Sequence, residues 1–161
     1  MRKLSYLILF ALLGIGLVFT SCEDDEEVKK SNQFKFKIDG EQKDWSSTAK
    51  IDYVAVLGLT NIVAYEGKDT VRISLAQQST GVFTDENEGD DNFFTNGIEF
   101  ANGTVKHNSL YSDEGFEIEI TKFEDEASTV EGSFSGTCAT IGIINEQDSV
   151  LITEGEFYVN K

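Results

Sequence analysis

The sequence predicts an all-β fold, either an antiparallel β-sandwich or an open barrel, built from roughly nine or ten short strands. The first observation is an apolar/polar alternation with a period of two that recurs after residue 33. Such alternation places one row of side chains on each face of a pleated strand, so each strand is half buried. The second observation is a series of turn motifs between these runs, and the third is that no helical periodicity is sustained after Cys22.

The alternation begins at Phe34, Phe36 and Ile38, and the Asp39-Gly40 pair that follows is a strong hairpin signal. Further turns are predicted at residues 66–69, 102–103 and 124–128. The later strands carry their apolar positions at Val71, Ile73 and Leu75, at Phe116, Ile118 and Ile120, at Val130 and Phe134, and at Ile152, Phe157 and Val159. We expect Phe36, Ile73, Ile118, Phe134 and Phe157 to lie in the core.

The chain contains no proline, whereas it contains 29 acidic residues. Edge strands must be prevented from pairing with other chains, and charge, bulges or glycine can do this where proline is missing. Most of the carboxylates are therefore explained by solvated strand faces and loops.

The N-terminus has the pattern of a signal peptide. Arg2 and Lys3 precede an almost wholly apolar run over residues 4–19, which ends in Thr20-Ser21-Cys22. A membrane-spanning helix needs roughly 20 apolar residues, and this run is shorter. We therefore predict that residues 1–21 are removed, which leaves 140 residues, enough for one domain with its own core.

Residues 19–22 resemble the lipobox of bacterial lipoproteins, with Phe19 in place of the usual Leu. The resemblance implies a diacylglycerol thioether on Cys22 and an acylated amino terminus, of the palmitate type. Two or more acyl chains hold a protein stably in a membrane.

Residues 22–33 are predicted to form a flexible acidic tether, because the segment has almost no apolar side chains to bury. The acidic run at residues 23–27 resembles the surface-export signal of Bacteroidetes lipoproteins. The resemblance implies lipid anchoring in the cell outer membrane with display on the cell exterior. The periplasmic face of the outer membrane is the alternative.

The predicted β domain, residues 34–161, resembles small Bacteroidetes lipoproteins of unknown function. The resemblance rests on an xxDGxxW-like turn in residues 34–45, a GxFSGT motif at residues 132–137 and an ITEGxF motif at residues 152–157. These motifs are structural, and the family brings no activity with it.

The formal charge is −16, and it becomes −18 once two of the 13 basic residues, Arg2 and Lys3, leave with the signal peptide. Such a charge repels nucleic acid and anionic lipid head groups. With Cys22 acylated, Cys138 has no intramolecular partner. Its strand-like neighbours predict a buried apolar thiol, although a reactive thiol or an intermolecular bridge is the alternative.

We find no motif for catalysis, cofactor binding or metal binding. His107 is the only histidine, and we expect it on the surface at a strand end or in a loop. The acidic stretch from Asp85 to Asn92 offers oxygen ligands, but its glycine is misplaced for a calcium loop and no glutamate closes it. We interpret it as a solvated loop that could bind calcium weakly.

Aromatic side chains could stack on sugars, although core packing explains most of them. The candidates are Trp45, Tyr53, Tyr65, Phe93, Phe94 and Tyr111. The sequence thus predicts a non-enzymatic binding or interaction module whose ligand it does not identify, with a glycan and an envelope protein as the candidates. The alternative is a carboxylate-based envelope hydrolase, which the acid count permits.

Overall fold

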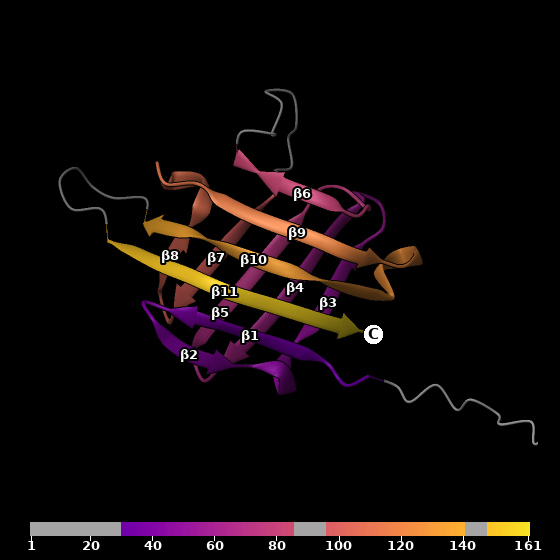
Figure 1. The fold of residues 1–161 in the computed structure, drawn as a ribbon, viewed down its shortest axis with the longest axis horizontal. Coiled ribbons are helices and arrows are strands. Elements are labelled where there is room, and N and C mark those ends of the chain that lie inside the picture. The colour runs from indigo at the N-terminus through magenta and orange to yellow at the C-terminus, as the bar shows by residue number, and fades with distance from the viewer. Residues whose placement is uncertain (1–29, 86–95, 141–147) are drawn as a thin grey trace, which may run out of the picture. The chain divides into compact units, whose positions relative to one another are not determined.

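A computed structural model describes residues 30–85, 96–140 and 148–161. This part of the chain is all-β and forms one antiparallel sheet of 11 strands that does not close on itself (Figure 1). The sandwich alternative of the predicted fold class is therefore consistent with the structure. The strands are β1 (Gln33–Ile38), β2 (Glu41–Asp44), β3 (Lys50–Val54), β4 (Leu59–Glu66), β5 (Asp69–Leu75), β6 (Gly81–Thr84), β7 (Gly97–Asn102), β8 (Val105–Asn108), β9 (Phe116–Phe123), β10 (Thr129–Thr140) and β11 (Ser149–Asn160).

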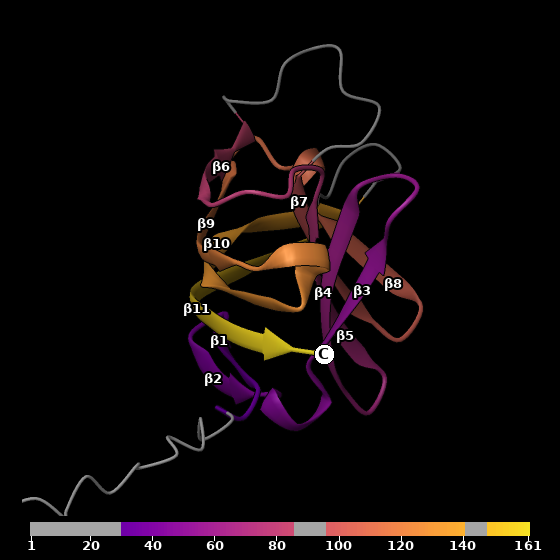
Figure 2. The ribbon, with the colours of Figure 1, turned by 90° about the vertical axis from the view of Figure 1, so that its right-hand side faces the viewer.

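The sheet folds into two layers that lie face to face (Figure 2). The first layer has the order β2-β1-β11-β10-β9-β6, and the second has the order β8-β7-β5-β4-β3. The strands of the two layers cross at a steep angle in Figure 1. The layers are joined where the end of β10 pairs with β8, through Ala139 opposite Asn108 and Thr140 opposite His107.

The predicted turns are confirmed. Asp39 (φ 49°) and Gly40 (φ 85°) both have positive φ and connect β1 to β2, as a type I′ hairpin turn requires. Residues 67–68 connect β4 to β5, and residues 103–104 connect β7 to β8. The β9–β10 connection contains the short 3₁₀ helix η4 (Asp125–Ala127), and two further 3₁₀ turns are η1 (Ser46–Thr48) and η3 (Ser109–Tyr111).

The strand count exceeds the predicted nine or ten by one or two. The strand that the alternation could not reveal is β2, whose four residues are all polar. It exists because it pairs with β1 along its whole length, with Phe36 opposite Lys43. Tertiary pairing overrides a poor local signal here.

The core lies between the layers and contains all five predicted residues, Phe36, Ile73, Ile118, Phe134 and Phe157. Its centre is aromatic. Phe34 lies 5.3 Å from Phe134 between ring centroids, and Phe36 meets the ring of Trp45 edge-on at 4.9 Å. Trp45 is thus a core residue, and its indole Nε1 donates a hydrogen bond to Glu66 at 3.0 Å.

A β-bulge interrupts β11 at its centre. Against β10, the register runs from Phe134 opposite Gly155 to Gly136 opposite Ile152, so β11 contains one extra residue. The pairing with β1 shows the same shift between Lys35 and Lys37. At the bulge Glu154 has a φ of +50°, a conformation that residues other than glycine rarely adopt.

The predicted signal peptide, the lipid attachment at Cys22 and residues 22–29 of the predicted tether lie outside the described residues. The predicted tether ends too late, because Asn32 is hydrogen-bonded to Ala49 and Gln33 already belongs to β1. The same holds for Phe93, Phe94 and the stretch that follows Asp85 in the acidic loop. Among the helices of the described part, none has the length and apolar character needed to cross a membrane.

Candidate functional groove

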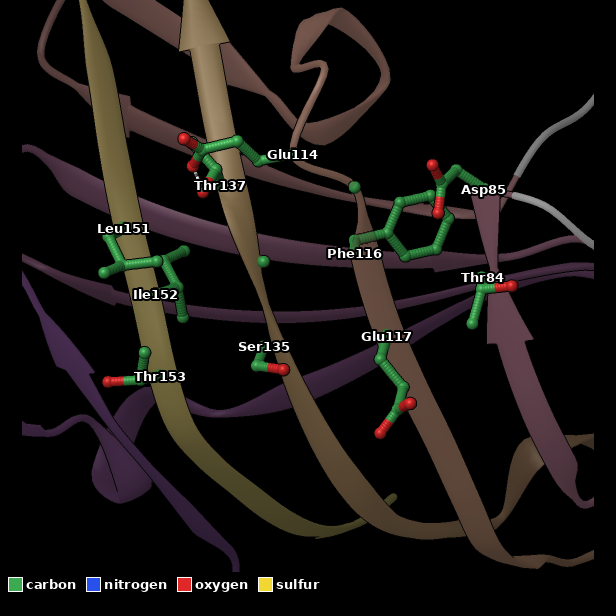
Figure 3. Close-up of a pocket in the computed structure, with 12 residues that line it drawn as sticks. Thr84, Asp85, Glu114, Phe116, Glu117, Ser135, Thr137, Leu151, Ile152 and Thr153 are labelled. Carbon is green, nitrogen blue, oxygen red and sulfur yellow. Dashed lines mark hydrogen bonds between the residues drawn. The ribbon is translucent and has the colours of Figure 1, made fainter.

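An open groove of about 510 Å³ lies over β6, β9, β10 and β11 in the first layer (Figure 3). Its described lining is dominated by hydroxyl, carboxylate and glycine residues. It consists of Thr84, Asp85, Glu114, Gly115, Phe116, Glu117, Ser135, Gly136, Thr137, Leu151, Ile152 and Thr153.

Strand register explains why these side chains meet. Thr84 of β6 pairs with Glu117 of β9, and Glu117 pairs with Ser135 of β10. Ser135 in turn faces the bulge of β11, where Thr153 lies. Residues directly opposite each other on neighbouring strands point to the same face of a sheet. These four side chains therefore form a row that crosses four strands on the solvent-facing side of the first layer.

The hollow exists because the middle of this face has small side chains. On β10 the outward positions are Ser133 and Ser135, and Gly136 has no side chain. A Cβ at Gly136 would lie only 2.7 Å from the Cβ and 2.9 Å from the Cα of Phe116, closer than real Cβ atoms approach. Glycine therefore allows β9 and β10 to approach at the floor of the groove.

Gly115 performs a related role at the end of the groove. Its φ is +75°, and a Cβ there would lie 2.8 Å from an oxygen of the Asp85 carboxylate. Glycine at this position lets the chain turn into β9 beside Asp85.

A smaller hollow of about 160 Å³ continues the groove along β10 toward the bulge. Glu117 and Ser135 line both, and Ser133, Phe134, Glu154 and Gly155 complete the second. The Glu154 carboxylate lies 2.6 Å from Nζ of Lys37 on β1. The bulge thus directs an acidic side chain to the edge of the groove, as bulges beside binding sites do.

The groove offers hydrogen-bond acceptors rather than cations. No Lys, Arg or His belongs to the described lining of the larger hollow, whereas three carboxylates do. The Thr137 hydroxyl donates to Glu114 at 2.7 Å, which fixes one of them (Figure 3). The Glu117 side chain is exposed. Across the described residues, no group of three or more His, Cys, Asp or Glu side chains is arranged to hold a metal ion.

The prediction for His107 is wrong. Its side chain is only 3% exposed, because β8 pairs with both β7 and β10 where the two layers join. The imidazole packs 5.8 Å from the ring of Phe100. Neither ring nitrogen has a hydrogen-bond partner among the described residues, and Nε2 lies 3.6 Å from an oxygen of Asp148.

The prediction for Cys138 is confirmed. The thiol is fully buried in β10, and burial raises its pKa to about 12. Of the other aromatic candidates, Tyr53 packs against the core, whereas Tyr65 and Tyr111 are exposed. None of these three residues lines the groove.

Sequence reasoning did not identify the groove residues, except that Asp85 belonged to the acidic loop. One signal was present in the GxFSGT motif of residues 132–137, where Phe134 alternates with serines. That pattern indicates a strand with a large inner row and a small outer row. It could not indicate which residues of neighbouring strands would surround the small ones.

Comparisons with protein-family models, with curated proteins and with solved structures find no match to this chain.

Proposed function

We propose that this protein is a lipoprotein anchored in the outer membrane through Cys22, and that its β domain binds a glycan in the groove of the first layer.

 The observation that supports the groove is its chemistry: a hollow lined by carboxylates and hydroxyls, with no basic side chain in its described lining. Ionised carboxylates only accept hydrogen bonds, so the ligand must supply donors. Neutral sugars, which carry many hydroxyl groups, meet this requirement, whereas anionic ligands would be repelled.

Several features favour binding over the hydrolase alternative. Carboxylate-based glycosidases work with a pair of acids on opposite sides of the bond that is cleaved. In the groove, Glu114 is occupied by the Thr137 hydroxyl, and Glu154 of the adjoining hollow is occupied by Lys37. The open shape of the groove leaves the ligand in contact with water, which weakens electrostatic stabilisation of a transition state.

The groove is tested by glycan binding with the full-length lipoprotein purified in detergent. A Glu117→Gln variant removes a charged acceptor from the groove. Its matched control is Glu119→Gln, because Glu119 lies two residues along the same strand, faces the same side and is outside the groove lining. A hydrogen bond to a charged group contributes about 1.5–3 kcal/mol, so we expect E117Q to weaken binding about tenfold or more.

We expect E119Q to bind as the unaltered chain does. If the two variants bind with equal affinity, or if the unaltered chain binds no neutral glycan, the groove is not the binding site. Release of new reducing ends during the assay would instead favour the hydrolase alternative.

The anchor is tested separately by mass spectrometry of the native membrane fraction, where we expect an acylated N-terminal Cys22. Cys22→Ala should leave the precursor uncut or release a soluble product. A mature chain with an unmodified Cys22 would contradict lipidation.

Surface display is tested by protease treatment of intact cells. Replacing the five acids of residues 23–27 with alanine should protect the protein from protease, because the export signal is then lost. If both forms are cleaved to the same extent, the acidic run is a simple linker.

A further inference from the structure

The turn between β3 and β4 is unusually apolar for a solvent-exposed connection. Residues 54–59 contain no polar side chain, and no charged residue occurs between Asp52 and Glu66. Val56 is 94% exposed and Leu57 is 48% exposed. We call residues 54–59 the apolar tip. Its conformation is defined, because Leu57 N donates to Val54 O at 3.0 Å and Gly58 N donates to Ala55 O at 3.3 Å.

We propose that the apolar tip inserts into the surface of a lipid bilayer. This inference concerns a surface separate from the groove, and it uses the proposed lipid anchor only to keep the domain near the membrane. The exposed side chains are aliphatic, and Val56 buries almost none of its surface in the fold. Lipid is the surrounding in which such side chains are favoured over water.

The side chains behind the tip suit the boundary between lipid and water. Tyr53 precedes the tip on β3, and Nζ of Lys161 lies 5.0 Å from the centre of its ring. Tyr53 is partly buried against the core, and the Lys161 ammonium also donates to Glu126 O at 2.6 Å. A tyrosine at this position can place the exposed part of its ring toward lipid and its hydroxyl toward the head groups. The absence of charge from residue 53 to residue 65 means that no carboxylate needs to enter the bilayer with the tip.

Two other occupants fit less well. Hot spots of protein–protein interfaces are rich in Trp, Tyr and Arg, whereas valine is under-represented in them, and the tip presents Val56 and Leu57. A second copy of this chain would bring together two bodies that each carry a formal charge of −18 once Arg2 and Lys3 have left with the signal peptide, and these would repel each other.

The reach of the chain permits the contact. Asn32 donates a hydrogen bond to Ala49 O just before β3, so the chain joins the domain at the opposite end of that strand from the tip (Figure 2). Five strand residues span roughly 17 Å. A stretch as long as residues 23–31, between the proposed anchor and the domain, can span at most roughly 30 Å. A domain held at Cys22 can therefore turn its tip toward the same membrane.

The test places an environment-sensitive fluorophore on the full chain through Val56→Cys. Cys138 does not compete for the label, because its thiol is buried, and Cys22 does not compete when its sulfur carries the proposed thioether. Mass spectrometry selects chains that carry one label, at position 56. The matched control is Val105→Cys, which is 45% exposed and lies at the turn between β7 and β8. Both labelled chains are reconstituted in phosphatidylcholine vesicles and separated by flotation.

We expect the emission of the probe at position 56 to shift to the blue and to rise severalfold, and iodide in solution to quench it less. The probe at position 105 should keep its emission in water. Leu57→Asp added to the position-56 chain should abolish the shift, and vesicles rich in phosphatidylglycerol should reduce it because of the negative charge of the domain.

An unchanged emission at position 56 in a chain that floats with the vesicles would overturn the inference while leaving the anchor intact. A chain that does not float would contradict the anchor instead. The same labelled chain would then be titrated with vesicles to saturation, and unchanged emission there would overturn the tip contact. A shift that follows protein concentration without vesicles would indicate a protein contact and would also overturn it.

Discussion

The two faces of β10 differ in the size of their side chains, which are large and buried on the inner face and small on the outer face. On the inner face, Phe134 packs against the aromatic rings of β1 and β11, and Cys138 is fully buried farther along. On the outer face, Ser133 and Ser135 occupy the alternate positions and leave the space of the groove. The groove therefore arises from missing side-chain volume on a regular strand.

The largest expected change in stability comes from truncating a side chain on the inner face of β10, compared with a truncation on its outer face. Phe134→Ala should destabilise the domain by about 3–5 kcal/mol, because a large buried ring is lost and a cavity remains. Ser135→Ala, one residue along and on the outer face, should change the free energy of unfolding by no more than about 0.5 kcal/mol. Urea denaturation measures both, and similar losses would show that the outer face is packed as tightly as the inner one.

The second test concerns the titration of the inner face. Burial raises the pKa of Cys138 from its ordinary value of 9.0 to about 12. A raised pKa in the folded state means that this contribution to stability is complete below pH 9 and is lost as the pH rises toward 12. The loss should approach about 1.4 kcal/mol per pH unit in that window.

The measurement is the free energy of unfolding as a function of pH for the unaltered chain and for Cys138→Ala. Subtracting the two curves removes the titration of the other groups. A difference that stays constant above pH 9 would contradict the burial of the thiol.

The third test adds volume at the floor of the groove. Gly136→Ala should cost about 2–3 kcal/mol, because its new Cβ would overlap Phe116. Gly103→Ala is the control, since Gly103 has a φ of +61° and nothing within 4 Å of the added Cβ. It should cost about 1 kcal/mol, from backbone conformation alone. Thermal denaturation measures both losses. A larger loss for Gly103→Ala than for Gly136→Ala would contradict the close approach of β9 and β10.

The smallest expected effect is at the bulge. Glu154→Gly relieves the positive φ of +50° but removes the exposed ion pair with Lys37, and each change is worth about 1 kcal/mol or less. We therefore expect a stability equal to that of the unaltered chain or up to about 0.5 kcal/mol higher. Glu117→Gly, within regular β9, should lower stability by about 0.5–1 kcal/mol. Equal losses in urea would show that the bulge stores no backbone strain.

Local sequence predicted the parts of the fold that depend on alternation and turn chemistry. Phe36 and Phe134 lie in the core because a strand places every second side chain on the same face. Asp39-Gly40 forms its hairpin because both residues accept a positive φ. Strand β2 escaped prediction because its partner, rather than its own composition, makes it a strand.

His107 shows the limit of the same reasoning. Its neighbours Lys106 and Asn108 are polar, so the local pattern indicates a surface position. The ring is buried because Phe100 and Thr140 pair with it from two different strands. A lone histidine carries no information about those pairings.

By itself, the sequence determined the all-β class, the main hairpins, the aromatic core and the buried state of Cys138, because each depends on neighbours within a few residues. Only the tertiary structure decided the groove and the exposure of the apolar tip. The groove needs Glu117, Ser135 and Thr153 on three strands in one register, and register between distant segments is set by the packing of the whole sheet. The tip is exposed because no other described element covers Val56, and this too depends on where distant segments lie.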